Sequence, residues 1–305
     1  MSRLAPRVAL LMTLPPLLWA GNAVVGRLLV GSVPPLTLNF LRWLLAALLL
    51  LPLGWRALRH PRDIAARWPH LLLLGLLGVG TYNALQYLAL VTTTPINVTL
   101  IAASSPVWML AVGAVLHGVH PQRRQIVGAA LSLGGVLLVI ARGEPSALMR
   151  VQFVAGDLYV LLAIIAWAFY SWMLARPPAS MRAPERPPWN WAEFLLVQMV
   201  FGLLGAGAAA GAELASGTAP VAWNGWVLAA LLYVAVGPSI VAYRCWGLGI
   251  AAGGPALAAF FGNLTPVFAA VLSAALLGEP PRWFHALAFA LIVAGILVSS
   301  ARRSI

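Results

Sequence analysis

The sequence contains no lysine, only seven acidic residues and a single cysteine, Cys245. A single cysteine excludes an intrachain disulfide and any metal or redox motif built from several cysteines. Charged residues make up 9% of the 305 residues, far below the roughly 25% of soluble domains. Because no polar stretch is longer than about 20 residues, the chain has no room for a separate soluble domain, and a large soluble enzyme is excluded.

Long apolar runs dominate what is present. Hydrophobic residues make up 62% of the chain, and runs near 20 residues recur from end to end, each long enough to cross about 30 Å of hydrocarbon. The first run is too long for a signal peptide and lacks a small-residue cleavage site, so we expect a first span kinked at Pro15 and Pro16. The runs predict an all-α membrane protein with ten transmembrane helices, near residues 7–28, 35–53, 70–91, 95–117, 124–141, 154–175, 192–212, 225–247, 253–277 and 283–301.

The basic residues, all of them arginine, predict the orientation. With the N-terminus inside, 13 arginines fall in inside segments and 4 in outside segments, while Arg42 and Arg244 lie within spans two and eight. This bias predicts cytoplasmic N- and C-termini, and it accounts for the net charge of +12 without a nucleic-acid partner. The Pro- and Arg-rich stretch 175–191 is expected to form an irregular cytoplasmic loop.

Two prolines in apolar segments indicate an internal repeat. Pro106 and Pro266 both stand where a helix interior normally rejects proline, at a cost of roughly 3 kcal/mol. The separation between these two prolines recurs between Gly135 and Gly295. Because five spans form each copy and five is odd, the second copy must enter the membrane inverted. We therefore predict a 5 + 5 inverted-topology repeat, an architecture of secondary transporters.

The same prolines predict a central cavity. In a bilayer, proline is tolerated where neighbouring helices or a water-filled space satisfy the freed carbonyl group. Hydroxyl and amide side chains precede each proline, in Ser104–Ser105 and in Asn263–Thr265. We expect spans four and nine to bend at Pro106 and Pro266 and to line a cavity between the two halves. Two related halves can exchange shapes, which gives inward-open and outward-open states of similar energy.

Three segments carry a family resemblance: LLWAGN at 17–22, GDLYVLLAIIAWAFYSW at 156–172 and TPVFAAVLSAALLGEPP at 265–281. With ten spans in a 5 + 5 repeat, they resemble the EamA family of the drug/metabolite transporter superfamily. The whole sequence is most similar to the YddG-type exporters of aromatic and other amino acids.

The resemblance covers nearly the whole chain and divides it into five-helix units at 8–141 and 155–301. It implies a multi-pass exporter in the bacterial inner (cytoplasmic) membrane, with a cavity built from spans 1, 3, 4, 6, 8 and 9. The family's Gly-Glu pair is present as Gly278-Glu279, but in the first half Gly118 is followed by valine. Glu279 is therefore not expected to take part in a symmetric mechanism.

Candidate binding residues follow from the needs of an amino acid. Its carboxylate needs N–H donors or a positive charge, its ammonium needs carbonyl groups or π faces, and its side chain needs an apolar surface. Aromatic and polar residues at helical spacing inside the spans offer these groups. We expect the substrate-binding residues to be Trp19, Asn22, Tyr82, Asn83, Gln86, Ser105, Trp108, Trp167, Tyr170, Tyr243, Arg244, Phe261 and Asn263.

The two arginines within spans are hypotheses of function, because a charge in the membrane needs partners. Arg244, beside Tyr243, is placed to meet a substrate carboxylate, or else to extend its head group to the interface. Arg42 is expected to pair with backbone carbonyls or with groups such as Gln198.

Carboxylates are missing from the middle of every span, and Asp157 and Glu193 fall near span ends. A proton or sodium relay usually uses an intramembrane carboxylate. We therefore expect facilitated export down a gradient. Asp157 or Glu193 would couple protons only if the cavity reaches them.

Other functions remain open. Efflux of drugs or other small metabolites is the main alternative, although cationic drugs usually require a buried carboxylate. A channel or lipid scramblase would show fluxes that do not saturate. A membrane-embedded enzyme would need a catalytic constellation, and no H-E-x-x-H or G-x-S-x-G motif occurs. We expect no catalytic residues, no cofactor or metal, broad amino acid specificity and a monomer in the lipid bilayer.

Overall fold

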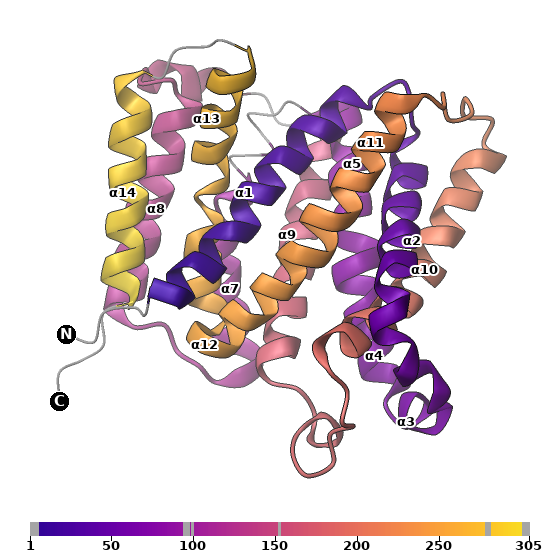
Figure 1. The fold of residues 1–305 in the computed structure, drawn as a ribbon. Helices are drawn as coiled ribbons and strands as arrows, with labels where there is room; N and C mark the ends of the chain where they lie inside the picture. Colours follow the sequence, from indigo (N-terminus) through magenta and orange to yellow (C-terminus); the bar gives the residue numbers. More distant parts are fainter. Residues whose placement is uncertain (1–5, 94–97, 99–100, 152–153, 278–281, 301–305) are drawn as a thin grey trace.

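Helices form the regular structure of the chain (Figure 1). The computed structural model describes residues 6–93, 98, 101–151, 154–277 and 282–300, which contain no β-strand. Within these ranges, eight segments are long and apolar enough to cross a membrane. The prediction of an all-α, multi-pass membrane protein is confirmed. The segments are Pro6–Gly26, Pro35–Arg59, Trp68–Thr92, Arg123–Ile140, Ala155–Ala175, Trp191–Ala215, Gly225–Gly262 and Trp283–Ser300.

Some of these segments contain several helices in succession. Two π-helical segments, Gly75–Thr81 and Ala235–Val241, connect α4 to α5 and α11 to α12. The α-helices are α1 (Pro6–Leu28), α2 (Pro35–Gly54), α3 (Pro61–Ala65), α4 (Trp68–Leu74), α5 (Tyr82–Thr92), α7 (Ser105–His117), α8 (Arg123–Ile140), α9 (Ala155–Ala175), α10 (Trp191–Ala215), α11 (Gly225–Val234), α12 (Ala242–Gly262), α13 (Thr265–Leu277) and α14 (Trp283–Ser300).

Two predicted spans differ in their boundaries. The chain stays helical from Gly225 to Gly262, across the expected gap between spans eight and nine, and its one non-helical residue there is Gly254. The φ of 80° at Gly254 is open to glycine and costly for other residues. Part of the expected span 95–117 lies outside the described residues, and its described helix is α7. Glu279 also lies outside them.

Pro106 and Pro266 are each the second residue of a helix, α7 and α13. The first turn tolerates proline because its N–H groups have no partner within the helix. A two-residue turn precedes each helix, at 103–104 and at 263–264. The chain therefore interrupts the helix just before each proline, whereas the sequence predicted a bend at the proline itself. Pro15 and Pro16, in contrast, lie inside α1, which remains helical.

The elements recur at a constant spacing along the chain. The two π-helical segments begin at Gly75 and Ala235, and this separation is the one between Pro106 and Pro266. The helices that follow them begin at the same separation from one half to the other, in the pairs α5 and α12, α7 and α13, and α8 and α14. The two halves of the sequence thus fold into the same succession of helical elements after the π-helical segments.

The most extensive helix contacts pair the two halves. Helix α14 packs on α8, α10 on α2, α12 on α1 and α9 on α5. Figure 1 shows α8 and α14 at one side of the bundle and α2 and α10 at the other. The α8–α14 contact is close because Gly128, Gly135 and Gly295 leave the facing backbones without side chains between them.

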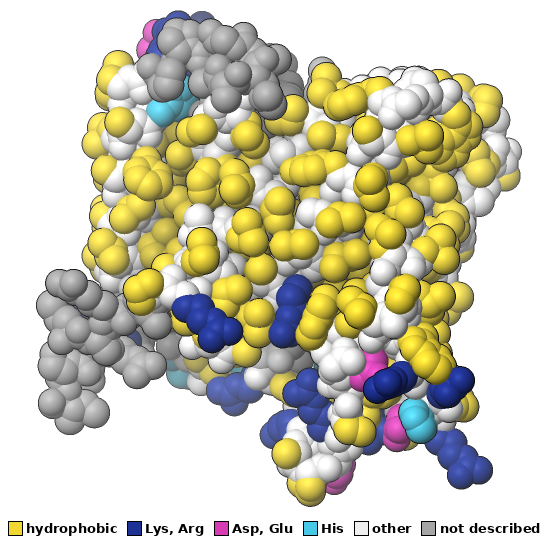
Figure 2. Space-filling model, in the orientation of Figure 1, with side chains coloured by type: hydrophobic (Ala, Val, Ile, Leu, Met, Phe, Trp, Pro, Cys, Tyr) yellow, Lys and Arg dark blue, Asp and Glu magenta, His cyan; other side chains and the backbone are white. Residues whose placement is uncertain are grey.

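Figure 2 shows basic side chains, which are all arginine in this sequence, gathered toward the lower end of the molecule. Arg67 holds this end together, because its guanidinium donates to the carbonyl oxygens of Asp63, Ser180 and Glu185 at 3.0, 2.8 and 2.6 Å. The loop between α9 and α10 is thereby fixed against the segment between α3 and α4.

Alanine at Gly135 should destabilise the α8–α14 contact, because its Cβ would lie 2.8 Å from the carbonyl oxygen of Ala288. Gly134→Ala is the control, since nothing lies within 4 Å of a Cβ there. Both variants gain similar helix propensity. Thermal unfolding in detergent should give Gly135→Ala a free energy of unfolding about 1–3 kcal/mol lower than that of Gly134→Ala. Equal melting temperatures for the two variants would contradict the packing.

Candidate functional site

A pocket of about 140 Å³ lies inside the helix bundle, and we call it the central pocket. Residues of α1, α5, α8, α9, α12 and α13, of the start of α7 and of the segment before it line the pocket, and none of the described lining residues is charged. The lining combines aromatic rings, amides, hydroxyls and small apolar groups. It consists of Trp19, Ala20, Asn22, Ala23, Tyr82, Asn83, Gln86, Val98, Ala102, Ala103, Ser105, Val136, Ile164, Trp167, Trp246, Gly262, Asn263, Thr265, Pro266 and Ala269.

Trp167 lies at the centre of a cluster of aromatic rings, each with its ring centroid near that of Trp167. The distances are 4.8 Å to Tyr82, 5.0 Å to Tyr170 and 5.3 Å to Tyr243. The rings of Trp19 and Trp246 are also 5.3 Å away. These are the separations at which aromatic pairs attract beyond simple burial. The cluster gives the central pocket a wall of π faces.

Aromatic side chains also satisfy carbonyl groups of the π-helical segments. The Tyr243 hydroxyl donates to the carbonyl oxygen of Gly78, and Trp19 Nε1 donates to that of Pro238 at 3.2 Å. Gly78 and Pro238 are both the fourth residue of their π-helical segments, so equivalent carbonyls are met in the two halves. The widened π turns and the pocket wall are thereby held by the same side chains.

Arg42 lies behind the central pocket and is fully buried. Its Nε and Nη2 donate to Ser239 Oγ at 3.0 and 2.7 Å. Its Nη1 donates to Asn83 Oδ1 at 3.0 Å, to Asn22 Oδ1 at 3.3 Å and to Tyr87 Oη at 2.9 Å. The expected pairing with Gln198 does not form, because Gln198 Oε1 accepts from Tyr170 at 3.1 Å.

A second pocket, of about 250 Å³, lies on the other side of the aromatic cluster. Tyr170, Tyr243 and Arg244 line it, and the Arg244 guanidinium lies 4.9 Å from the ring centre of Trp191. Because Tyr170 and Tyr243 contact Trp167, which lines the central pocket, the aromatic cluster forms the wall between the two pockets.

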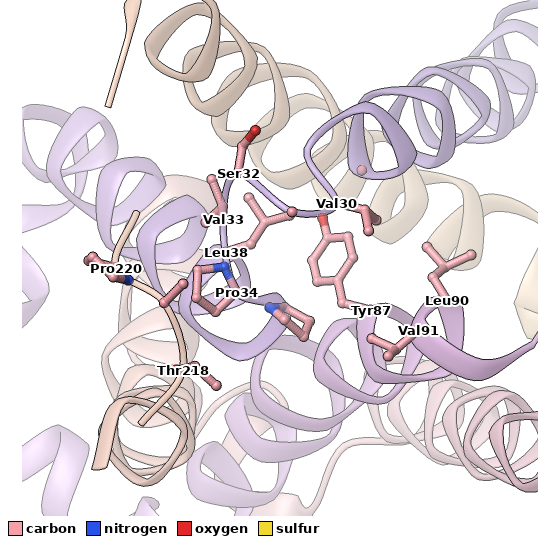
Figure 3. A pocket seen from close by; sticks show the side chains of 14 residues that line it. Val30, Ser32, Val33, Pro34, Leu38, Tyr87, Leu90, Val91, Thr218 and Pro220 are labelled. Atoms are coloured by element: carbon pink, nitrogen blue, oxygen red, sulfur yellow. The ribbon is translucent and has the colours of Figure 1, made fainter. Parts of the chain in front are cut away.

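A third pocket, of about 290 Å³, lies between the loop after α1, the end of α5 and the segment 218–220 (Figure 3). Its lining is mostly apolar, with Val30, Leu38 and Leu90 among its side chains. The ring of Tyr87 forms part of this pocket, while its hydroxyl contacts Arg42 and Asn22. Tyr87 therefore stands between the third pocket and the buried arginine.

The structure brings most of the predicted binding residues to one cavity. Tyr170, Tyr243 and Arg244 line the second pocket instead. Trp108 donates to Ser104 Oγ at 3.1 Å, and Phe261 is buried in the core, so neither lines the central pocket. The predicted residues that line the central pocket are Trp19, Asn22, Tyr82, Asn83, Gln86, Ser105, Trp167 and Asn263, together with Pro266.

Several lining residues carry no signal in the sequence. Ala102, Ala103 and Ala269 form part of the pocket surface, but alanine is common throughout the spans. Tyr87 and Ser239 contact Arg42 from helices that the sequence cannot place next to it. The lining residues that could be predicted, such as Asn22, Asn83 and Trp167, are polar or aromatic side chains among apolar neighbours.

The carboxylates near span ends lie elsewhere. Asp157 accepts hydrogen bonds from Thr93 Oγ1 and from the backbone N–H of Val154. Glu193 accepts from the backbone N–H of Asn190 at 2.6 Å. Glu213, at the end of α10, accepts from the backbone N–H groups of Leu36 and Thr37 at 2.9 and 2.7 Å and so caps α2. None of them lines the central pocket.

A bundle of membrane-spanning helices around an uncharged aromatic pocket defines the class of small-molecule membrane transporters. Comparison with known proteins gives the family. The chain belongs to the EamA-like transporter family, which matches residues 6–141 and 154–301. The resemblance seen in the sequence is confirmed.

The relatives include transporters of known and unknown substrate. The chain is 28% identical to an uncharacterized transporter of Archaeoglobus fulgidus, over 96% of this chain and 97% of that protein. It is 26% identical to the aromatic amino acid exporter YddG of Ancylobacter novellus, over 90% and 91% of the two chains. It is 28% identical to the uncharacterized inner membrane transporter YedA of Escherichia coli, over 92% and 87%.

A solved crystal structure shares the fold. It superposes with a TM-score of 0.74 at 23% identity and covers 96% of each chain. At that identity the likeness shows the fold alone.

Removing the Tyr243 hydroxyl should destabilise the protein. Tyr243→Phe leaves the carbonyl of Gly78 without its donor and Asn83 Nδ2 without its acceptor, at an expected cost of about 1–3 kcal/mol. Tyr159→Phe is the control, because Tyr159 is 39% exposed. Thermal unfolding in detergent should show a lower melting temperature for Tyr243→Phe than for the wild type, and an unchanged one for Tyr159→Phe. If both variants melt like the wild type, the hydroxyl does not hold the π-helical segment.

Proposed function

We propose that the protein is a secondary transporter that exports amino acids, aromatic and other apolar ones among them, from the cytoplasm. The observation that carries this proposal is the lining of the central pocket, which combines π faces, amide groups and small apolar side chains. Such a lining offers each part of an amino acid a partner. The relative named as an aromatic amino acid exporter supports the same substrate class.

The proposed binding residues come from the predicted set. Trp19, Tyr82 and Trp167 would stack on the substrate side chain or on its ammonium, and Asn22 and Gln86 would bind its polar groups. Trp246 and Thr265 join the set because they line the same pocket. Tyr170, Tyr243 and Arg244 would contact the substrate in the second pocket, on its route to or from the central one.

The architecture that we propose is ten transmembrane helices in two inverted units of five, 8–141 and 155–301. The constant offset between equivalent elements of the two halves supports the repeat. Pairing of α1 with α12 and of α5 with α9 supports a symmetric arrangement, since the helices of one half recur in the same contacts in the other. An inverted repeat permits alternating access by exchange of shape between the halves.

The central pocket is small for this task. Ligand sites usually enclose roughly 300–1,000 Å³, and this one encloses about 140 Å³. An aromatic amino acid therefore requires the rings around Trp167 to move apart. Such a movement would also open the wall toward the second pocket, which supports alternating access rather than a fixed channel.

We propose that export is facilitated and runs down the gradient of the substrate itself. The carboxylates of Asp157 and Glu193 cap helix starts and lie outside the central pocket. Efflux of apolar drugs or metabolites is the second candidate, favoured by the apolar part of the same lining. We further propose a monomer in the bacterial inner membrane with both termini in the cytoplasm. Relatives named as inner membrane transporters support the location.

Transport should be measured with purified protein in liposomes. We expect saturable uptake of labelled phenylalanine, tryptophan, methionine and threonine, unchanged by a pH gradient. Ala102→Phe should fill the pocket and reduce uptake of tryptophan more than that of threonine, whereas Ala229→Phe, at an exposed position on α11, should transport normally. Folded wild-type protein that moves no amino acid would remove the proposal and leave drug or metabolite efflux.

Orientation can be tested by cysteine labelling. Cys245, the sole cysteine, is buried and can be replaced by alanine. In that background, Ala219→Cys and Ala179→Cys place single thiols at exposed positions in loops on opposite sides of the membrane. A membrane-impermeant maleimide added to intact cells should label Ala219→Cys, and should label Ala179→Cys only after lysis. The reverse pattern would place the termini outside.

A further inference from the structure

Arg42 is a buried cation whose hydrogen-bond partners among the described residues are all neutral. It is 0% exposed, and its five hydrogen bonds end on Ser239, Asn22, Asn83 and Tyr87, none of which carries a negative charge. Within the described part of the chain, the one ion pair joins Arg67 to Asp63, at the arginine-rich end of the molecule. The charge of Arg42 is therefore solvated by the protein but left unneutralised.

An unneutralised guanidinium inside a membrane protein is costly, because taking a charge out of water costs several kcal/mol even after relaxation. Arginine cannot escape this cost by losing its proton. Four polar side chains from α1, α5 and the second π-helical segment are committed to it. Apolar side chains of similar volume in place of Arg42 and its partners would stabilise the bundle at least as well. Stability alone therefore does not explain why a charge is present here.

Arg42 fixes the orientation of two amide groups that lie between it and the central pocket. Asn22 and Asn83 both line the central pocket, and both direct Oδ1 toward Arg42 Nη1. An amide that turns its oxygen to a cation must turn its NH2 group elsewhere. For Asn83 the NH2 group donates to the Tyr243 hydroxyl at 3.3 Å. For Asn22 the oxygen also accepts from Tyr87 at 3.0 Å, and no partner within the described residues takes its NH2 group.

The electrostatic potential in the central pocket is therefore positive, although the described lining residues are uncharged. Asn22 offers an N–H donor, and Arg42 stands directly behind it in a medium that screens charge weakly. No charged residue in the described lining of the pocket opposes this field. A group with negative charge is stabilised beside Asn22, and an ammonium group at that position is not.

We infer that the central pocket selects substrates bearing a carboxylate, which binds at Asn22 under the field of Arg42. The inference rests on the proposed transport function and defines its substrate class further: the carboxylate is required, and the amino group is not. Arg42 is a positioning residue that acts through Asn22. The ammonium of an amino acid then lies toward the π faces of Trp19 and Trp167.

Four ligands that share a benzyl side chain separate these requirements. Phenylalanine has both charged groups, 3-phenyllactate has only the carboxylate, and phenylalaninamide and phenethylamine have only the amine. We expect phenylalanine and phenyllactate to be transported in liposomes and to raise the melting temperature of the wild type. The two amines should do neither.

Asn22→Asp tests the role of the amide without loss of shape. The new carboxylate forms an ion pair with Arg42, so the variant should fold, and it replaces the N–H donor by an acceptor. The half-saturation concentration for phenylalanine and phenyllactate should rise about 10- to 100-fold, and phenylalaninamide should now bind. Asn224→Asp, at the exposed start of α11, is the matched control and should keep wild-type selectivity.

Arg42 itself is tested by a pair of variants. Arg42→Gln should lose the preference for acids over amines, and Arg42→Lys, which keeps the charge, should retain at least part of it. If Arg42→Gln does not fold, the Asn22→Asp selectivity decides the question alone. A purely structural role for Arg42 would alter melting temperatures but leave the ratio of acid to amine binding unchanged.

The outcomes separate this inference from the transport proposal. Equal transport of phenylalaninamide and phenylalanine by the wild type overturns the inference and keeps amino acid transport. Binding of phenyllactate without transport of any amino acid keeps the inference and overturns the proposed substrate. Wild-type binding of none of the carboxylates, or unchanged selectivity in folded Asn22→Asp, also overturns the inference.

Discussion

The constraint on which this structure depends is that a membrane interior has no water to satisfy the backbone. At four points where the helices depart from regular α geometry, a side chain completes the hydrogen bonding. Tyr243 and Trp19 meet carbonyls of the two π-helical segments, and Asn263 Nδ2 reaches the carbonyl of Ala103, in the turn before α7, at 3.4 Å. Thr265 Oγ1 donates to the carbonyl of Gly262 at 2.7 Å. These irregular points surround the central pocket, so satisfying the backbone and building the site are one task.

That task is divided between the halves of the chain. Asn263 and Ala103 stand at equivalent positions of the two halves, as do Asn83 and Tyr243, whose side chains also bond directly. A residue in one half therefore satisfies the counterpart of its own position in the other half. Contacts of this kind hold the two halves in register around the pocket. They also mean that any movement that separates these partners disturbs both halves at once.

Much of the fold could be predicted from the sequence, because hydrocarbon thickness fixes the length of apolar runs. The nature of the proline sites could not. Pro106 and Pro266 were expected to bend continuous helices, but whether a helix bends or stops depends on which neighbours receive the freed groups. Asn263, which bonds to Ala103 and to Ser132 Oγ at 2.9 Å, lets the chain stop and restart. The boundary at Gly254 was missed because glycine is frequent throughout these helices and marks no single place.

The candidate site could also be predicted from the sequence only in part. A polar side chain in an apolar run is costly unless it is enclosed, so Asn22, Asn83 and Gln86 could be assigned to the interior from sequence alone. Arg42 and Arg244 look alike by that argument, since both are cations within spans. The structure separates them: Arg42 is fully buried among side chains of three other elements, whereas Arg244 is only half-buried and lies over Trp191 in the second pocket. What distinguishes them is the set of partners that tertiary packing brings, and spacing along one helix carries no information about it. The positive potential in the central pocket therefore comes from Arg42, which does not line the pocket itself.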